Sequence, residues 1–180
     1  MDYLNQISMK KIYFLAIVAL FIGCTTEEEK VANKKVMGYK PIYTDYESIR
    51  KIELQKARGL TSPGKIYIKG KYLYINESGD GIHIFDNTDK ANPKPLAFLS
   101  IPVNKDISIK DNILYADNGD DLVTIDISDV NSIKVLKRVE KAFPYPSYPN
   151  ERGYFECVDP SKGYVKSWEY VELTNPKCFR

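Results

Sequence analysis

The sequence predicts an all-β fold: a partial β-propeller-like array of two four-stranded blades, a C-terminal β-hairpin and one N-terminal surface helix. Three observations support this prediction. From Lys65 onward, short apolar or alternating runs are separated by Gly, Asn, Asp and Pro, a pattern typical of strands and turns. The same order of runs recurs at a spacing of 40 positions, as from Asp86 to Asp126. A repeat of about 40 residues with four short strands is the signature of a propeller blade.

The two repeats align along most of their length. The segment from Tyr72 to Lys94 matches the segment from Ile113 to Lys134, which is one residue shorter in its first turn. Two blades do not close a ring, so sheet faces and edges are left that need a cover. The sequence offers the N-terminal helix or the C-terminal segment for this role, and a second molecule is the third alternative.

A surface helix is predicted between Asp45 and Arg58, ahead of the repeats. Thr44 and Glu47 have the spacing of a capping box, and the apolar residues that follow recur along one side. Gly59 provides a C-terminal stop. The charged residues of this segment leave its other face in water.

A β-hairpin is predicted after the repeats. Its strands are Gly153 to Val158 and Tyr164 to Leu173, and the turn between them runs from Asp159 to Gly163. The Pro-rich piece from Phe143 to Pro149 predicts an extended connection into this hairpin.

The repeats resemble the LVIVD repeat family, whose units combine an LYIAD-like strand, a Gly/Asp turn and an LVIVDISDP-like strand. The matching stretches are Leu114 to Asp117, Leu122 to Asp129, Ile82 to Asp86, and Asn92-Pro93-Lys94. The resemblance covers about Gly64 to Phe143. It implies a propeller-like fold in a bacterial envelope lipoprotein, and it implies almost nothing about an activity.

The N-terminus has the pattern of an export signal. Met9 to Cys24 reads MKKIYFLAIVALFIGC, with two lysines before an apolar run of about 11 residues. A membrane-spanning helix needs roughly 20, so this run fits a signal peptide; the alternative is a buried N-terminal helix. Gly23-Cys24 resembles the lipobox of bacterial lipoproteins, although Phe21 replaces the usual Leu. The resemblance implies cleavage after residue 23 and diacylation of Cys24. Asp2 and several polar residues stand ahead of the basic segment, which is unusual for a signal peptide, so we expect Met9 to be the natural start.

The cellular location implied by this resemblance is the cell envelope. The protein would be an outer-membrane lipoprotein that faces the periplasm or the cell surface. Residues 24–40 are polar and predict a flexible tether. The run Glu27-Glu28-Glu29 resembles the surface-export signal of Bacteroidetes lipoproteins, or it is a solvated part of the linker. The predicted parts are therefore a signal peptide (1–23), a lipidated tether (24–40), a helix and connection (41–63), two repeats (64–143) and a C-terminal cap (144–180).

The charges almost cancel. The chain has 26 Lys and Arg against 24 Asp and Glu, and removal of residues 1–23 leaves 24 against 23. Such a balance creates no long-range field for polyanions, so we do not expect nucleic-acid binding.

Cysteine usage agrees with an oxidising compartment. Acylation of Cys24 leaves the even pair Cys157 and Cys178, a candidate disulfide that would stabilise the fold by roughly 3 kcal/mol. Two free thiols are the alternative. A metal site is less favoured, because the only histidine, His83, is far away in sequence.

Catalytic and metal sites have weak support in the sequence. His83 alternates with two isoleucines and predicts a solvent-facing strand residue. Asp117, Asp120 and Asp121 form an acidic Gly-containing turn whose oxygens could suit calcium, but Asp, Asn and Gly are also the ordinary residues of turns. We expect plain turns, no resident metal or cofactor, and no enzymatic activity. Asp86, Asp126 and Asp129 are expected to bond backbone amides at strand ends.

Aromatic residues are the remaining candidates for binding. The chain has 14 tyrosines, and we expect some of the rings to form a surface for a glycan or a peptide; the rest pack across strands. The selected ligand-binding residues are Tyr72, Tyr74, Tyr115 and Trp168. The resulting prediction is a lipid-anchored binding or scaffold protein. The alternative is a surface lipoprotein that binds a glycan or peptide through tyrosines, and its partners would be the membrane and another envelope protein or glycan.

Overall fold

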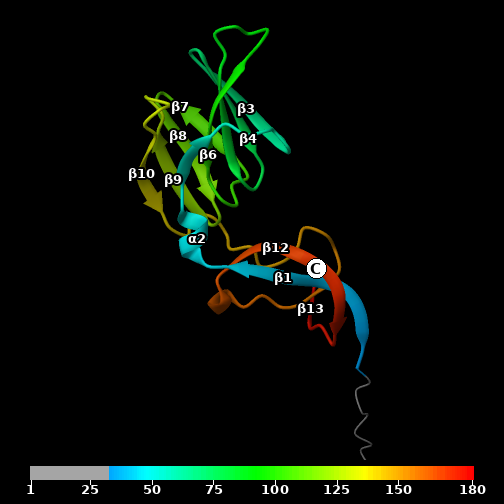
Figure 1. Cartoon of the computed structure of the whole chain (residues 1–180). Helices are drawn as coiled ribbons and strands as arrows, with labels where there is room; N and C mark the ends of the chain where they lie inside the picture. The colour runs from blue at the N-terminus through cyan, green and yellow to red at the C-terminus, as the bar shows by residue number, and fades with distance from the viewer. Residues whose placement is uncertain (1–32) are drawn as a thin grey trace, which may run out of the picture. The chain divides into compact units, whose positions relative to one another are not determined.

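Three β-sheets and one short α-helix make up the part of the chain that the structure, a computed structural model, describes (Figure 1). The described residues are 33–180. The predicted signal peptide, Cys24 and the first part of the tether therefore lie outside them. No helix among the described residues is long and apolar enough to cross a membrane.

The first two sheets are the predicted blades, but blade 1 has five strands where four were predicted. Blade 1 has the strand order β2-β6-β5-β4-β3, and blade 2 has the order β10-β9-β8-β7. Every neighbouring pair in them is antiparallel. The bounds of the blade 1 strands are β2 (Glu53–Lys56), β3 (Pro63–Lys69), β4 (Tyr72–Glu77), β5 (Gly81–Asp86) and β6 (Lys94–Ser100). Those of blade 2 are β7 (Ile107–Lys110), β8 (Ile113–Asn118), β9 (Asp121–Asp126) and β10 (Lys134–Val139).

The main core lies between the two blades. Side chains alternate across a strand, so each blade has one apolar side toward the other. Blade 1 contributes Tyr74, Ile82 and Ile84 to a buried cluster, and blade 2 contributes residues such as Leu114 and Val123. Two sheets packed in this way exclude water from both inner faces.

Aspartates close the strand ends as predicted. Asp86 and Asp126 each accept a hydrogen bond from the backbone N–H two residues later, at 2.8 Å in both repeats. Asp129 accepts one from the N–H of Asn131 at 2.9 Å. These contacts are Asx turns, which fix the direction of the chain as it leaves the sheet.

The helix prediction was wrong in length and in its cap. Helix α2 covers only Tyr46–Arg50, and its N-cap is Asp45, which accepts a hydrogen bond from the N–H of Ser48. The chain is extended at Lys51 and then forms β2, which pairs with β6. The physical reason is tertiary: the open edge of blade 1 offers backbone partners along a whole strand, which outweighs a weak helical periodicity.

The predicted C-terminal hairpin was also wrong. The third sheet has the order β12-β1-β11-β13, so a strand from the N-terminal side separates the two expected hairpin strands. Its members are β1 (Lys35–Thr44), β11 (Tyr154–Phe155), β12 (Tyr164–Thr174) and β13 (Cys178–Phe179), with a 3₁₀ turn, η1 (Pro160–Lys162), before β12.

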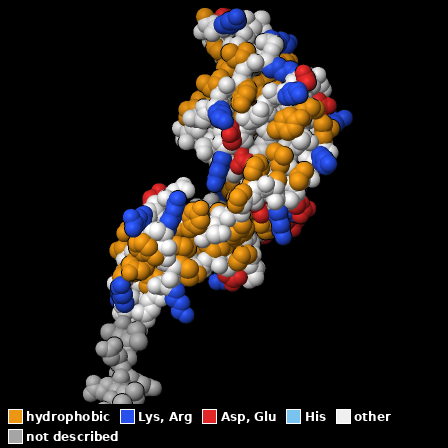
Figure 2. Space-filling view, turned by 180° about the vertical axis from the view of Figure 1, so that it is seen from behind, with side chains coloured by type: hydrophobic (Ala, Val, Ile, Leu, Met, Phe, Trp, Pro, Cys, Tyr) orange, Lys and Arg blue, Asp and Glu red, His pale blue; other side chains and the backbone are white. Residues whose placement is uncertain are grey.

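Residues 35–40, predicted as tether, belong to β1. This strand pairs antiparallel with β12 over ten residue pairs and parallel with β11. The strand pattern was weak because exposed apolar residues occur on both sides of β1: Met37 and Ile42 lie on opposite sides and are both in solvent. Figure 2 shows such exposed apolar side chains between single Lys and Arg side chains.

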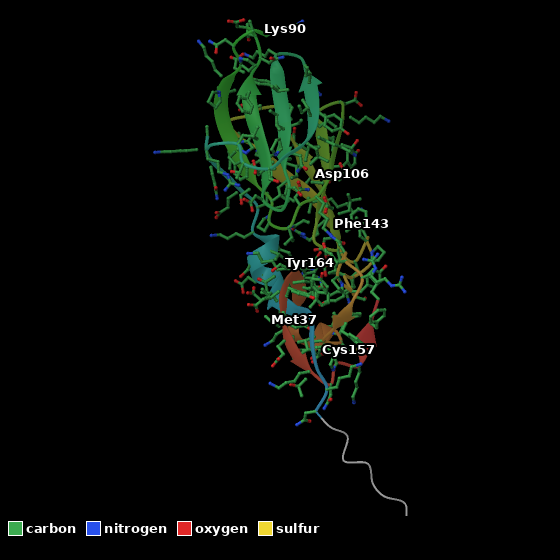
Figure 3. All side chains as sticks on the ribbon, turned by 90° about the vertical axis from the view of Figure 1, so that its right-hand side faces the viewer. Met37, Lys90, Asp106, Phe143, Cys157 and Tyr164 are labelled. Atoms are coloured by element: carbon green, nitrogen blue, oxygen red, sulfur yellow. A yellow bond between two sulfur atoms is a disulfide. The ribbon has the colours of Figure 1, made fainter. Side chains whose placement is uncertain are left out.

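A disulfide joins Cys157 to Cys178, as predicted (Figure 3 labels Cys157). Cys178 is in β13 and pairs across the sheet with Phe155 of β11. The two strands have only two residues each, so backbone pairing alone holds them weakly. The bond fixes this end of the third sheet.

Removal of the disulfide should destabilise the protein. We expect Cys178→Ser to lower the free energy of unfolding by about 3 kcal/mol, because the bond closes a loop with a sequence separation of 21. Urea unfolding under non-reducing conditions measures the change. The control is the double change with Cys157→Ser, which should cost no more than the single change. Equal stability of the wild type with and without reductant would contradict the expectation.

Candidate functional site

A hollow lies over the side of blade 2 that carries Tyr115 and extends past the edge strand β7 to β3 of blade 1. We call it the tyrosine groove. Its floor is formed by Ser108, Tyr115, Asp117 and Leu122, which alternate along their strands with the core residues. Among the described residues no further blade follows blade 2, so no repeat unit covers this side, and the floor is open to ligands.

The walls of the groove come from both directions along the chain. Lys65 and Tyr67 of β3 form one wall, and the segment Phe143–Tyr148 forms the other. Tyr164, at the start of β12, lies with them. The cavity has a volume of about 800 Å³, within the range of natural ligand sites. Figure 3 labels Asp106, Phe143 and Tyr164 along this side.

The Pro-rich wall is held in place by hydrogen bonds and ring contacts. The N–H of Phe143 donates to the carbonyl of Asp120 at 2.9 Å. The hydroxyl of Tyr145 donates to the carbonyl of Gly163 at 2.6 Å. The rings of Tyr145 and Tyr164 meet edge to face at 5.9 Å. The prolines restrict the backbone further, so the wall is largely preorganised for binding.

The charges in the groove balance. Its lining contains two lysines, Lys65 and Lys105, and two aspartates, Asp106 and Asp117. Lys65 Nζ lies 2.6 Å from Asp106 Oδ2 in an exposed ion pair. The groove therefore offers polar contacts without a net preference for anions or cations.

Asp117 stabilises the groove from below. Its carboxylate accepts hydrogen bonds from the backbone N–H groups of Lys105 and Asp106 and from the amide of Asn104. Burial raises the pKa of Asp117, and those backbone hydrogen bonds offset only part of the rise. The carboxylate fixes the loop before β7.

The hydroxyls of Tyr145 and Tyr164 stay protonated at neutral pH. Burial raises the pKa of Tyr164 to about 12 and also raises the pKa of Tyr145. Each ring thus offers a neutral aromatic body with a polar tip.

Of the four predicted ligand-binding residues, only Tyr115 lines the groove. The choice of Tyr74 was wrong, because its ring is 1% exposed and belongs to the core between the blades. Tyr72 is half-buried and packs against the same core. Trp168 lies in the third sheet, where its ring meets Phe155 edge-on at 5.7 Å. Strand periodicity predicts that these rings lie on strands, but it does not predict which side of each blade is exposed to solvent.

The sequence prediction counted the other rings of the groove among the possible binding tyrosines but did not select them. Tyr67, Tyr164 and the neighbouring Tyr145 and Tyr148 come from three separate segments that meet only in the fold. One signal was present: Phe143–Pro149 alternates aromatic residues with proline directly after the last blade. Such a segment is stiff and extended, and it must cross an end of the blade array.

The acidic turn has a structural role. Asp121 is fully buried and lies 2.8 Å from Arg50 Nε and 2.9 Å from Arg138 Nη1. It thereby links α2 to β10 at one end of blade 2. Asp120 accepts a hydrogen bond from the hydroxyl of Tyr46 at 3.0 Å. Asp117, Asp120 and Asp121 thus each have different partners, and residues 33–180 contain no group of three acidic, His or Cys side chains arranged for a metal.

The prediction of a solvent-facing His83 was wrong. The residue is 2% exposed, and its Nε2 lies 2.8 Å from Glu77 Oε2. The segment before β3 covers this side of blade 1: Thr61 and Ser62 donate backbone hydrogen bonds to Glu77. Burial alone would raise the pKa of Glu77, but these bonds and His83 outweigh it and keep that pKa below its usual range.

The comparisons with known proteins agree with the repeat architecture. The family model described as LVIVD repeat matches residues 63–95 and 104–140. The first match runs from β3 into β6, and the second runs from before β7 through β10. Searches of the curated proteins and of the solved structures find no match. The chain therefore contains two LVIVD repeats, and these form propeller-like blades.

Loss of the Asp121 carboxylate should destabilise the fold. We expect Asp121→Asn to cost about 3 kcal/mol, because two arginines lose their buried counter-charge. The matched control is Glu140→Gln, which removes the exposed partner of the same Arg50 and should cost less than about 1 kcal/mol. Urea unfolding at pH 7 measures both, and equal losses would contradict the assignment.

Asp121→Asn should also change how the stability of the fold depends on pH. Burial alone would raise the pKa of Asp121, but the N–H of Lys141 and the two guanidinium groups outweigh it and lower that pKa. A lowered pKa gives stability that is present above the ordinary value of 3.8 and is lost as the pH falls below it. The wild type should therefore lose more stability on acidification than Asp121→Asn.

Proposed function

We propose that this protein is an envelope-anchored binding module that holds a neutral carbohydrate chain in the tyrosine groove. One observation carries the proposal: aromatic side chains from three separate segments line a single groove beside blade 2. These segments are β3, β8 and Phe143–Tyr148.

The chemistry of the lining favours a sugar. A pyranose ring has C–H groups on its faces, which pack against aromatic rings, and hydroxyls around its rim, which need polar partners. Tyrosine provides both parts in one side chain, and Ser108, Ser147 and Asn150 add polar groups. The balanced lysines and aspartates favour an uncharged ligand over an acidic or basic one.

Binding without turnover agrees with the state of the carboxylates. Asp106 is paired with Lys65, and Asp117 accepts bonds from its own loop. A pair of carboxylates for acid–base chemistry on a sugar would face each other across the ligand. Here each one stabilises the wall or floor of the groove.

The proposed anchor is the diacylated Cys24. Two acyl chains give stable attachment, since one chain alone is marginal. From Cys24 to Lys35, where β1 begins, the chain has 11 residue steps, and these extend to at most about 40 Å. The groove would then remain close to the membrane surface and within reach of envelope glycans.

Tyrosine removal tests the groove. We expect Tyr115→Ala and Tyr148→Ala each to weaken binding of a neutral oligosaccharide about tenfold, or about 1.4 kcal/mol. Isothermal titration of the full chain in detergent against a panel of neutral oligosaccharides measures the change.

The matched control is Tyr170→Ala. Tyr170 is 57% exposed on the third sheet, close to the 56% of Tyr148, and it lies outside the groove. An equal loss in the control, or binding of extended peptides in place of sugars, would overturn the carbohydrate assignment.

The anchor has its own test. Cys24→Ser should move the chain from the membrane fraction to the soluble fraction, because no acyl chain can form on serine in this reaction. Fractionation of cells and intact-mass measurement of the membrane-bound form check it. Cys157→Ser is the control and should stay membrane-bound. A membrane-bound Cys24→Ser chain would contradict the lipid anchor.

A further inference from the structure

The Pro-rich wall of the tyrosine groove is held at two points that belong to different parts of the fold. Its first half is bonded through the hydroxyl of Tyr145 to the carbonyl of Gly163, directly before β12. Its second half, residues 148–150, contacts Arg180, which directly follows β13. The two halves of the wall therefore have independent supports.

Arg180 holds the second half of the wall through three contacts. Its Nη1 donates hydrogen bonds to the carbonyls of Pro149 and Asn150, each at 2.5 Å. Its guanidinium lies over the ring of Tyr148, 4.6 Å from the ring centre, in a cation–π contact. Tyr148 and Asn150 line the groove, but Arg180 does not. Arg180 thus positions the lining without occupying the groove.

The position of Arg180 depends on a very short piece of sheet. Its N–H donates to the carbonyl of Gly153 at 3.1 Å, and the preceding strand β13 pairs with β11 over two residues only. Backbone pairing of this length is marginal in water. Cys178 lies two residues before Arg180, and its bond to Cys157 is the covalent link that holds β13 in place.

The disulfide is accessible in the folded protein. Cys157 is exposed and Cys178 is half-buried, and Cys157 also lines a second hollow, on the third sheet. Reduction of a disulfide requires a thiolate to reach one of its sulfur atoms. A reductant can therefore attack this bond without prior unfolding of the blades.

We propose that the bond between Cys157 and Cys178 is a redox switch for the tyrosine groove, an inference that rests on the proposed binding of sugar. In the oxidised chain the bond holds β13 and Arg180, and Arg180 holds residues 148–150. Reduction releases Arg180, so the second half of the wall becomes mobile, and Tyr145 keeps its own support. Sugar binding is then weaker, because it has to order Tyr148 and its neighbours.

The reaction is thiol–disulfide exchange with a protein dithiol of the Cys-X-X-Cys type. One thiolate of the dithiol attacks the exposed Sγ of Cys157, the bond to Cys178 breaks, and the Cys178 thiolate takes up a proton. The second thiolate of the dithiol attacks its partner sulfur in the mixed disulfide and releases Cys157. Two electrons pass to this chain, which gains two thiols, and the dithiol becomes a disulfide.

Fluorine NMR tests the switch without any ligand. The full chain in detergent carries fluorotyrosine at residue 148 or, in a second sample, at residue 145, and spectra are recorded before and after addition of dithiothreitol. We expect the resonance at Tyr148 to move toward that of the free amino acid and the resonance at Tyr145 to stay. An unchanged resonance at Tyr148 would overturn the proposal, and so would equal shifts at both labels.

Calorimetric titration with a neutral oligosaccharide tests the effect on binding. Reduction should weaken binding by the wild type about threefold to tenfold. Arg180→Ala keeps the disulfide but lacks the contacts to the wall. Its oxidised form should bind as weakly as the reduced wild type, and dithiothreitol should have little further effect on it.

The matched control is Arg152→Ala. The guanidinium of Arg152 also lies over an aromatic ring, that of Phe179 in β13, at 6.0 Å, but Arg152 does not line the groove. This variant should keep the affinity of the wild type and its response to reduction. Loss of both in Arg152→Ala would overturn the specific role of Arg180.

The two proposals fail in different ways. If no neutral oligosaccharide binds the oxidised wild type, the carbohydrate assignment fails, and the NMR shift at Tyr148 alone decides the redox switch. If sugar binds with the same affinity before and after reduction, or if Arg180→Ala responds to reduction as strongly as the wild type, the redox switch is overturned and the groove remains a sugar site.

Discussion

The packing of one blade against the other is the constraint on which the rest of the structure depends. Each blade is a small twisted sheet with an apolar side, and such a sheet is not stable when that side faces water. Tyr74 and Ile84 of blade 1 and Leu114 and Val123 of blade 2 bury one another. The lysines of β3 reinforce this contact at its edge. Everything else in the described chain is attached to the resulting pair.

The attachment of the third sheet depends on polar groups at one end of blade 2. Asp121 binds Arg50 of α2 and Arg138 of β10, and Asn118 donates to the carbonyl of Ile49 at 2.7 Å. Ile49, in turn, is buried with Tyr164 at the start of β12. The acidic turn between β8 and β9 therefore does more than reverse the chain: it holds the helix that leads from β1 into the blades.

The repeats could be predicted from sequence because their signal is local. The alternation of apolar and polar residues predicts the strands, and Asp and Gly predict the turns between them. The recurrence of this pattern every 40 residues predicts the blades. The third sheet could not be predicted in this way, because its pairing joins β1 to β12 across most of the chain. The length of helix α2 was overestimated for a similar reason, because Glu53–Lys56 pairs with β6 as a strand. His83 and Tyr74 show the same limit for sites, since periodicity gives the side of a strand but not what covers it.

The tyrosine groove follows from the small number of blades. In a longer array, the side of blade 2 with Tyr115 and Leu122 would be buried under a third blade. Here the chain leaves β10 and crosses this side as the segment Phe143–Tyr148, which is too narrow to fill the space of a sheet. Proline keeps the segment extended, and its tyrosines line the groove together with Tyr115 of the floor. An incomplete propeller thus converts a blade-packing surface into a binding surface, with tyrosine suited to both roles because its ring packs and its hydroxyl remains wet.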